Sequence, residues 1–184
     1  MCALGWDVLA TDTAHTISSV LSPNIASNYP RLSCNGGTIQ TRELDWLVPP
    51  ESWDWTNPAA VASANPGPYT LTSVTRANEA ILQPPFDLII SSDTIYTAEL
   101  VQPLLRALHT AVTASGSPPV YLCIERRDSA VVNRALSEAE GIWGFTVSRV
   151  GHRKVSKAME KGSLNWKKED WDGVEIWRLK LKNV

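Results

Sequence analysis

The segment Ser91-Ser92-Asp93-Thr94-Ile95-Tyr96 combines hydroxyls, a carboxylate and, three residues later, a phenol. It directly follows the apolar run Phe86–Ile90. Short runs of this kind are typical of strands in parallel sheets that helices cover on both faces. In such sheets the loops at the carboxyl ends of the strands form the ligand crevice. The sequence therefore predicts that this segment lines a functional site.

Carboxylates recur after apolar runs, at Asp12, Asp45, Asp93 and Glu125. In a parallel sheet these strand ends share one edge, so up to four carboxylates are expected to line one crevice. An acidic residue after the second strand of a nucleotide-binding fold commonly binds ribose hydroxyls, and Trp46 offers a flat apolar face for a purine. In the alternative, each carboxylate caps the helix or turn that follows it. The residues alone leave both interpretations open.

The elements that position these residues follow from hydrophobic periodicity. The predicted strands are Trp6–Ala10, Thr38–Leu44, Phe86–Ile90, Val120–Ile124, Phe145–Val150 and Val174–Leu181. Helices are predicted over 14–29, which Pro23 is expected to split, over 96–113, and over a segment that begins at the N-cap Asp128. This alternation predicts an α/β fold with a doubly wound, mostly parallel sheet. The last two strands, with no predicted helix between them, are expected to form a C-terminal antiparallel β-hairpin.

A chain of 184 residues suits a single domain, 1–184, that is long enough to bury a core. Two regions depart from the alternating pattern. Residues 47–84 form a proline-rich loop insertion containing Trp53 and Trp55, and loops of this length are usually functional or disordered. Residues 151–173 form a basic connection between the last two strands.

Composition excludes several classes of protein. No run of 18 apolar residues exists, so we expect no membrane span. Three cysteines without a Cys-x-x-Cys pair favour reduced thiols in an intracellular protein, cytoplasmic or nuclear, and three histidines without ligand spacing give no reason to expect a metal. Residues 149–184 hold 10 basic and 5 acidic residues. Such a basic end could meet an acidic partner or a nucleic acid. Because the two signs are interleaved, we favour a solvated surface and do not expect a nucleic-acid partner. The sequence does not define the oligomeric state.

The order of these pieces resembles the seven-β-strand S-adenosylmethionine-dependent methyltransferases. Within them the chain looks most like the lysine methyltransferase-like branch called methyltransferase family 16. The resemblance covers most of residues 4–145 and is interrupted between residues 49 and 84. The matching segments are Leu4–Asp12, Asn24–Asn28, Glu43–Trp46, Phe86–Tyr96 and Val120–Arg126. The combination of Leu-Asp-Trp with Asp-x-x-Tyr is fairly specific to this branch.

The resemblance implies a Rossmann-like fold, S-adenosyl-L-methionine as cofactor and a protein lysine as methyl acceptor. Carried over residue by residue, it implies that Asp12 binds the cofactor ribose, that Trp46 packs near the adenine and that Ser92 contacts the cofactor. Asp93 and Tyr96 are the implied catalytic residues, at the place where the amine approaches. Methyl transfer is an in-line displacement, so the protein mainly positions the two reactants.

One feature of the family is missing from this sequence. Family members carry a first strand that ends in a Gly-rich loop, whereas the sequence contains no Gly-x-Gly. We therefore expect the first strand and the Gly-rich loop to be missing from an N-terminally truncated, incomplete domain. The leading hypothesis is a protein-lysine N-methyltransferase. The alternative is a catalytically inactive methyltransferase-like fragment or interaction module that lacks the cofactor loop. A dehydrogenase is a distant third, since no dinucleotide fingerprint is present.

Overall fold

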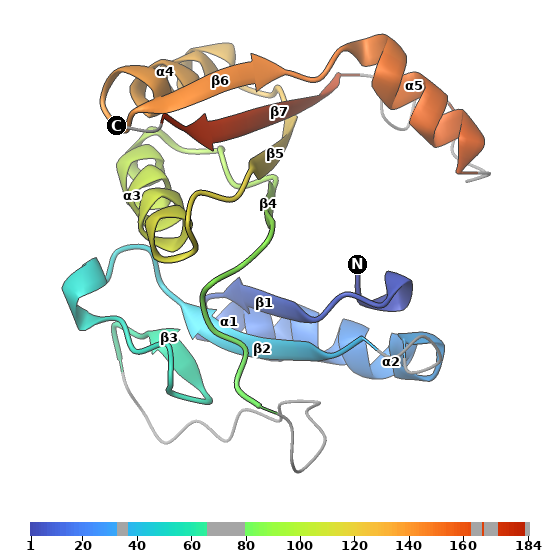
Figure 1. Cartoon of the computed structure of the whole chain (residues 1–184), viewed down its shortest axis with the longest axis vertical. Coiled ribbons are helices and arrows are strands. Elements are labelled where there is room, and N and C mark those ends of the chain that lie inside the picture. The colour runs from blue at the N-terminus through green and yellow to red at the C-terminus, as the bar shows by residue number, and fades with distance from the viewer. Residues whose placement is uncertain (33–36, 66–79, 163–166, 168–172, 183–184) are drawn as a thin grey trace. The chain divides into compact units, whose positions relative to one another are not determined.

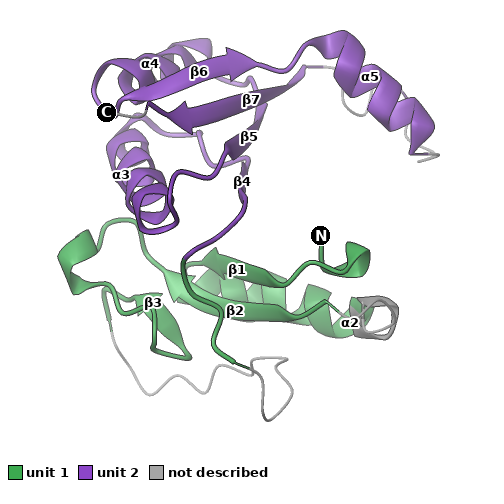
Figure 2. Ribbon diagram, in the orientation of Figure 1, with its two compact units in different colours: residues 1–84 green, residues 85–184 purple. Residues whose placement is uncertain are grey.

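The computed structural model describes residues 1–32, 37–65, 80–162, 167 and 173–182. The chain divides into two compact units, residues 1–84 and residues 85–184 (Figure 2). The predicted single domain stays a prediction, and the two units are described in turn. The mixed α/β, Rossmann-like fold is confirmed. Within the described residues no helix is long and apolar enough to span a bilayer.

Unit 1 is built on a parallel sheet with strand order β1-β2-β3 (Figure 1). The strands are β1 (Val8–Asp12), β2 (Ile39–Leu44) and β3 (Ala60–Ala62). β3 lies inside the predicted 47–84 insertion, where no strand was expected, and a short 3-10 turn, η4 (Pro50–Ser52), precedes it. β1 starts two residues later than predicted, because Gly5, at φ 86°, closes the 3-10 turn η1 (Cys2–Leu4). As a result Asp12 is the last residue of β1 and no longer follows it.

The helical segment between β1 and β2 is continuous but changes its hydrogen-bonding pattern along its length. α1 (Ala14–Thr16) passes into a π-helical segment, η2 (Ile17–Leu21), and then into α2 (Ser22–Leu32). Pro23 lacks an N–H and its ring crowds the preceding turn. A π-helical segment before the proline accommodates the missing hydrogen bond and the ring without ending the helix. The predicted split at Pro23 is therefore a change of helix type. Ile17, which is fully buried, and Ile25 face the core of the unit.

The side chains of β2 tie the insertion to the sheet of unit 1. Gln40 accepts a hydrogen bond from the Leu82 amide at 2.8 Å and donates to the Ala80 carbonyl at 2.7 Å, as a neighbouring strand would. Arg42, only 1% exposed, donates to the carbonyls of Trp55 (2.7 Å) and Asn57 (3.3 Å) and to that of Leu82. A buried guanidinium is tolerated only when its donors are satisfied. These bonds satisfy Nη1 and Nη2 with the carbonyls of Trp55, Asn57 and Leu82, whereas Nε has no hydrogen-bond partner among the described residues.

Unit 2 holds a second sheet with strand order β4-β5-β7-β6 (Figure 1). The strands are β4 (Ile89–Ser92), β5 (Val120–Glu125), β6 (Phe145–Arg149) and β7 (Val174–Leu181). β4 and β5 are parallel, and β7 lies antiparallel to both β5 and β6. The predicted antiparallel C-terminal pair is confirmed, and its second strand lies between β5 and β6.

The start of β4 is set by its partner. Ile89 pairs with Val120, so the residues before Ile89 lie opposite Pro118 and Pro119. Prolines have no N–H to donate to a ladder. The predicted strand Phe86–Ile90 was therefore placed too early, and Ser92 is its last residue instead of following it.

The helices of unit 2 are α3 (Ala98–Ala114), α4 (Ser129–Gly141) and α5 (His152–Lys161). The predicted N-cap of α4 is confirmed, since the Asp128 carboxylate accepts from the amides of Ala130 and Val131. The prediction that no helix joins the last two strands was wrong, because α5 occupies the basic connection 151–173. The core of this unit is apolar, with the almost fully buried side chains Leu104, Leu105, Leu122, Ile124, Phe145 and Leu179.

Candidate functional site

The loop between β4 and α3 presents two of the predicted residues to solvent. Ile95, 7% exposed, anchors the loop in the core, and Tyr96 beside it is 58% exposed. Asp93 adopts φ 52°, a left-handed conformation that aspartate tolerates better than most residues. Its amide still donates to the Cys123 carbonyl at 2.9 Å. The loop thus holds a carboxylate and a phenol on either side of a buried anchor, and Ser92 is also exposed.

Arg127 pairs with Asp93 and with the strand-end carboxylate of β5. Its Nη2 lies 3.4 Å from Asp93 Oδ2 and 2.5 Å from Glu125 Oε2, and its Nε donates to the same Glu125 oxygen at 2.9 Å. The hydrogen bond to Glu125, followed by the charge of Asp93, raises the pKa of Arg127. These groups are more than half exposed, so their pairing adds little to stability. The effect of this pairing is to hold the Arg127 guanidinium beside Asp93, the carboxylate where the methyl-accepting amine is predicted to approach.

The sequence prediction did not assign a role to Arg127. The signal was present in Glu125-Arg126-Arg127, where basic residues follow an acidic strand end at the edge predicted to bind a ligand. Any cationic group that approaches Asp93 from solvent competes with this guanidinium. Arg127 therefore belongs to the candidate site.

In unit 1, Asp12 is the last residue of β1 and directly precedes Thr13, the N-cap of α1. Its Oδ1 accepts from the amide of Thr13 at 2.7 Å and lies 3.5 Å from the Thr13 hydroxyl. No hydrogen bond to Oδ2 is found from the described part of the chain. Asp12 thus binds the adjacent Thr13 through Oδ1 and has Oδ2 available for a ribose hydroxyl.

Asp45 and Trp46 follow β2. Asp45 Oδ1 accepts from the amide of Leu47 at 2.9 Å, which is the capping alternative for this carboxylate. Trp46 packs with Trp53 and Trp55 against the small apolar cluster of Leu44, Val61 and Ala62. Its ring is half-buried, so one part supports the insertion and another part reaches solvent.

The predicted crevice of four carboxylates separates into two pairs. Asp93 and Glu125 meet through Arg127 within unit 2. Asp12 and Asp45 follow neighbouring parallel strands of unit 1, so they share one edge of its sheet. Each pair lies at the carboxyl ends of parallel strands, as the sequence predicted. The joint role of the two pairs stays a prediction.

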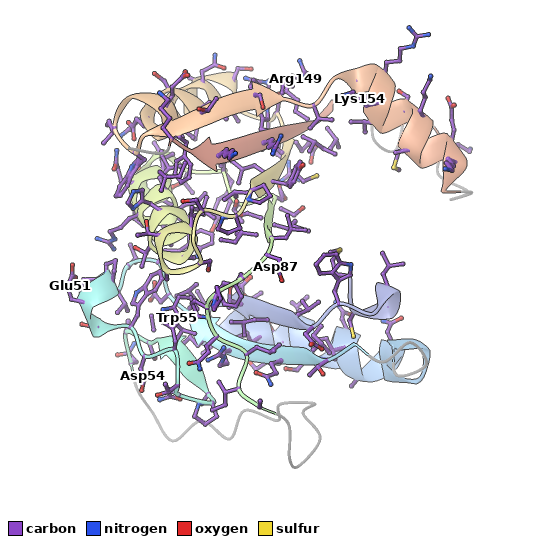
Figure 3. All side chains as sticks on the ribbon, viewed as in Figure 1. Glu51, Asp54, Trp55, Asp87, Arg149 and Lys154 are labelled. Atoms are coloured by element: carbon purple, nitrogen blue, oxygen red, sulfur yellow. The ribbon has the colours of Figure 1, made fainter. Side chains whose placement is uncertain are left out.

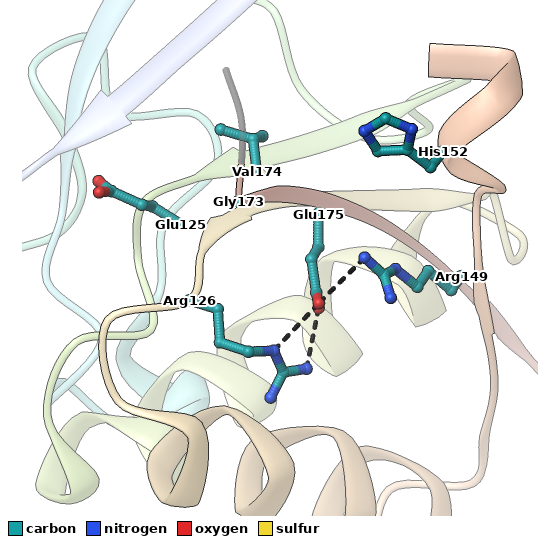
Figure 4. A pocket seen from close by; sticks show the side chains of 7 residues that line it. All are labelled: Glu125, Arg126, Arg149, His152, Gly173, Val174 and Glu175. Atoms are coloured by element: carbon teal, nitrogen blue, oxygen red, sulfur yellow. Dashed lines mark hydrogen bonds and ion pairs between the residues drawn. The ribbon is translucent and has the colours of Figure 1, made fainter. Parts of the chain in front are cut away.

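A second polar centre in unit 2 surrounds Glu175 of β7 (Figure 4). Its carboxylate accepts from Arg126 Nε at 3.1 Å and Nη2 at 2.8 Å, from Trp177 Nε1 at 2.8 Å, and pairs with Arg149 Nη2 at 3.1 Å. The hydrogen bond from Arg126 is the main cause that lowers the pKa of Glu175. A cavity of about 540 Å³ adjoins this centre, bordered also by His152 and Glu125.

Some of these residues fit the cofactor that the resemblance implies, whereas no cluster among the described residues fits a metal. The unengaged oxygen of Asp12 fits a ribose hydroxyl, and the partly exposed ring of Trp46 fits the edge of an adenine. Ser92 is exposed at the end of β4. The sequence offers no Gly-x-Gly backbone to approach the methionine portion closely. In the described residues, no three His, Cys, Asp or Glu side chains gather as metal ligands.

The mixed α/β fold, with carboxylates at the ends of parallel strands, is consistent with a Rossmann-like domain. The family model described as lysine methyltransferase matches residues 70–138, a range that includes β4, α3, β5 and most of α4. This match confirms the predicted resemblance to methyltransferase family 16 over that segment. No curated protein matches the chain in sequence.

The matched range includes some predicted site residues and not others. Ser92, Asp93 and Tyr96 lie inside it, together with Arg127. Asp12 and Trp46 lie outside it. The roles of all these residues stay predictions, and those in unit 2 have the additional support of the family match.

Proposed function

We propose that the chain is an S-adenosyl-L-methionine-dependent protein-lysine N-methyltransferase, acting in the cytoplasm or nucleus. One observation carries the proposal. Asp93 and Tyr96 stand exposed on either side of the buried Ile95, within the segment that matches the lysine methyltransferase family. A carboxylate beside an aromatic face is a suitable receptor for an alkylammonium group.

The cofactor would supply an electrophilic methyl group on a sulfonium, and Asp12, Trp46 and Ser92 are the residues proposed to hold it. The side chains of this protein then position the acceptor. Asp93 orients the lysine amine, which must lose its proton before it attacks. The ring of Tyr96 stabilises the positive charge that returns as the new C–N bond forms. Arg127 neutralises Asp93 in the absence of acceptor and yields the carboxylate when the lysine arrives.

The catalytically inactive alternative has its own supporting observation, since the sequence contains no Gly-x-Gly loop. A domain without that loop lacks backbone donors that side chains elsewhere do not replace. In this alternative, the exposed residues of the β4–α3 loop bind a partner without transferring a methyl group.

Single-turnover methyl transfer separates the two functions. The purified chain, in excess, is incubated with millimolar S-adenosylmethionine and lysine-containing peptides, and methyl-lysine is measured by mass spectrometry. Cofactor binding is measured in parallel by calorimetry. Asp93→Asn should abolish transfer and leave cofactor affinity unchanged, and Asp12→Ala should weaken cofactor affinity. Asp87→Asn, which changes an exposed carboxylate just before β4, is the matched control.

The outcomes are distinct. Methyl-lysine that depends on Asp93 and not on Asp87 supports the enzyme. Absence of both methyl-lysine and cofactor binding, in a folded protein, supports the inactive module. An unchanged affinity in Asp12→Ala would refute the proposed ribose contact.

A further inference from the structure

At the cavity of unit 2, the buried carboxylate of Glu175 is shared by two guanidinium groups, of which that of Arg149 is the more exposed. Two arginines, Arg126 and Arg149, converge on this one carboxylate. The other carboxylate at the cavity, Glu125, is already paired with Arg127. The Arg149 guanidinium is 49% exposed and faces the cavity (Figure 4). The cavity therefore presents an accessible cation whose nearest carboxylate is shared.

Helix α5 continues this positive region. Figure 3 shows Arg149 at the end of β6 and Lys154 in the first turn of α5, which extends beyond the ends of β6 and β7. None of its residues is buried. Of its ten residues, Arg153, Lys154, Lys157 and Lys161 are basic and Glu160 alone is acidic. The net charge of the helix is thus about +3 with His152 neutral.

The charges of α5 oppose the stability of the helix itself. Arg153, Lys157 and Lys161 recur at every fourth position, so like charges face one another along one side. The first turn holds two basic residues, Arg153 and Lys154, and no acidic one, and the N-cap Gly151 makes no side-chain hydrogen bond. Basic residues at a helix N-terminus are unfavourable, because that end carries the positive pole of the dipole. A bound anion would relieve both repulsions.

We propose that α5 and the adjoining cavity bind an acidic polypeptide segment. One carboxylate side chain enters the cavity against Arg149 and the first turn of α5. Further acidic residues of the segment pair with the stripe of Arg153, Lys157 and Lys161. The half-buried Val155 and Met159, four residues apart on α5, offer a narrow apolar strip beside the charges. This binding surface requires no methyl transfer and stands apart from the proposed function.

The side chains of this surface favour a polypeptide over a nucleic acid. α5 carries no Phe, Tyr or Trp side chain on which a base could stack. The arginines at the cavity already bind a carboxylate, Glu175, through two parallel hydrogen bonds from Arg126.

Fluorescence anisotropy with a labelled polyglutamate peptide tests the proposal on the full chain. We expect binding that weakens as salt rises. The triple variant Arg153→Glu, Lys157→Glu, Lys161→Glu should weaken it by about tenfold or more, and Arg149→Gln by about threefold. Lys180→Gln removes an exposed cation of β7 outside the surface and should leave affinity unchanged. Amide hydrogen exchange of residues 152–161 should slow when the peptide binds.

Four results would overturn the proposal. They are no binding at low salt, equal weakening by Lys180→Gln and by the triple variant, unchanged exchange in α5, and duplex DNA of matched charge binding as tightly as polyglutamate. The last would assign the surface to nucleic acid. Because the α5 side chains are exposed, the triple variant should keep the fold, which circular dichroism checks.

Discussion

The carboxylates at strand ends have different partners in the two units. In unit 1, Asp12 and Asp45 accept hydrogen bonds from the backbone amides one and two residues ahead. In unit 2, Asp93 and Glu125 pair with the guanidinium of Arg127. A sequence pattern of strand followed by carboxylate therefore describes two kinds of site, a local turn and a charge network between strands.

The cores differ in the same sense. Unit 2 packs apolar side chains from α3, β5, β6 and β7. In unit 1 the largest fully buried side chain among the described residues is Arg42, whose Nη1 and Nη2 donate to carbonyls of the insertion. Unit 2 is thus stabilised mainly by burial of apolar surface, whereas the insertion of unit 1 is held in part by hydrogen bonds to the side chains of Gln40 and Arg42. Four substitutions test this contrast.

The largest effect is expected from Leu122→Ala in unit 2. Leu122 is 1% exposed in the centre of the sheet, and truncation of such a leucine typically costs about 2–5 kcal/mol, because a cavity remains. Urea denaturation measures the loss, and hydrogen exchange should place it in β5 and its neighbours. A cost below about 1 kcal/mol would show that the core is not tightly packed.

Arg42→Met should cost about 3 kcal/mol in the free energy of unfolding. The change keeps most of the apolar stem and leaves the carbonyls of Trp55, Asn57 and Leu82 without their donor, at about 1–3 kcal/mol for each buried carbonyl left unpaired. Part of that loss is offset, since burial lowers the pKa of Arg42 and its charge is costly to bury.

Hydrogen exchange separates the two substitutions. Arg42→Met should raise exchange in β3 and in residues 54–61 and leave β5 unchanged. If both variants raise exchange equally in both units, the units do not differ in the way proposed. Arg42→Lys, which keeps the charge and loses the fork of donors, should fall between the parent and Arg42→Met.

Local patterns predicted much of this fold. The strands Val120–Ile124 and Val174–Leu181 and the N-cap Asp128 depend on residues adjacent in sequence, and the structure has them within one residue. The strands that moved, β1 and β4, are bounded by their partners. The ladder of β4 begins where Pro118 and Pro119 end on the neighbouring strand. Periodicity within one segment does not contain that information.

The candidate site was predicted by residue type and not by partner. Asp93 and Tyr96 were found because they follow an apolar run, whereas Arg127 was overlooked because its role depends on a contact 34 residues along the chain. Helix α5 was missed because its apolar residues are few. Val155, Ala158 and Met159 nevertheless have helical spacing, which was the available signal.

Glu175→Gln should remove a pH-dependent part of the stability of unit 2. The hydrogen bond from Arg126 lowers the pKa of Glu175 in the folded state below its ordinary value of 4.5. The stabilisation is therefore fully present above that ordinary value and is lost as the pH falls through the lowered one. We expect a cost of about 2 kcal/mol at pH 7, since hydrogen bonds to a charged group contribute about 1.5–3 kcal/mol.

Urea denaturation of parent and variant across pH checks this expectation. The difference between them should shrink below pH 4.5 as the carboxylate of the parent becomes protonated. Glu140→Gln, at an exposed carboxylate of α4, is the control and should follow the parent. A difference between parent and Glu175→Gln that stays constant with pH would mean that the Glu175 charge is not what stabilises the cluster.

The smallest effect is expected at the open edges of the two sheets. β1 pairs with β2 only and β4 with β5 only, so within the described residues each has one unpaired edge. Unpaired edges with apolar side chains promote association of chains. Ile90 in β4 is 54% exposed, whereas no residue of β1 is fully exposed. Association should therefore begin at β4 of unit 2.

Ile90→Lys should reduce self-association by about fivefold, which corresponds to about 1 kcal/mol. Sedimentation velocity over a range of concentrations measures it. Ile142→Lys is the matched control, because Ile142 is 65% exposed but follows α4 and lies on no strand. Equal reductions in the two variants would indicate general hydrophobic association. A chain that stays monomeric at every concentration would contradict the prediction, because it would show that the edge of β4 does not promote self-association.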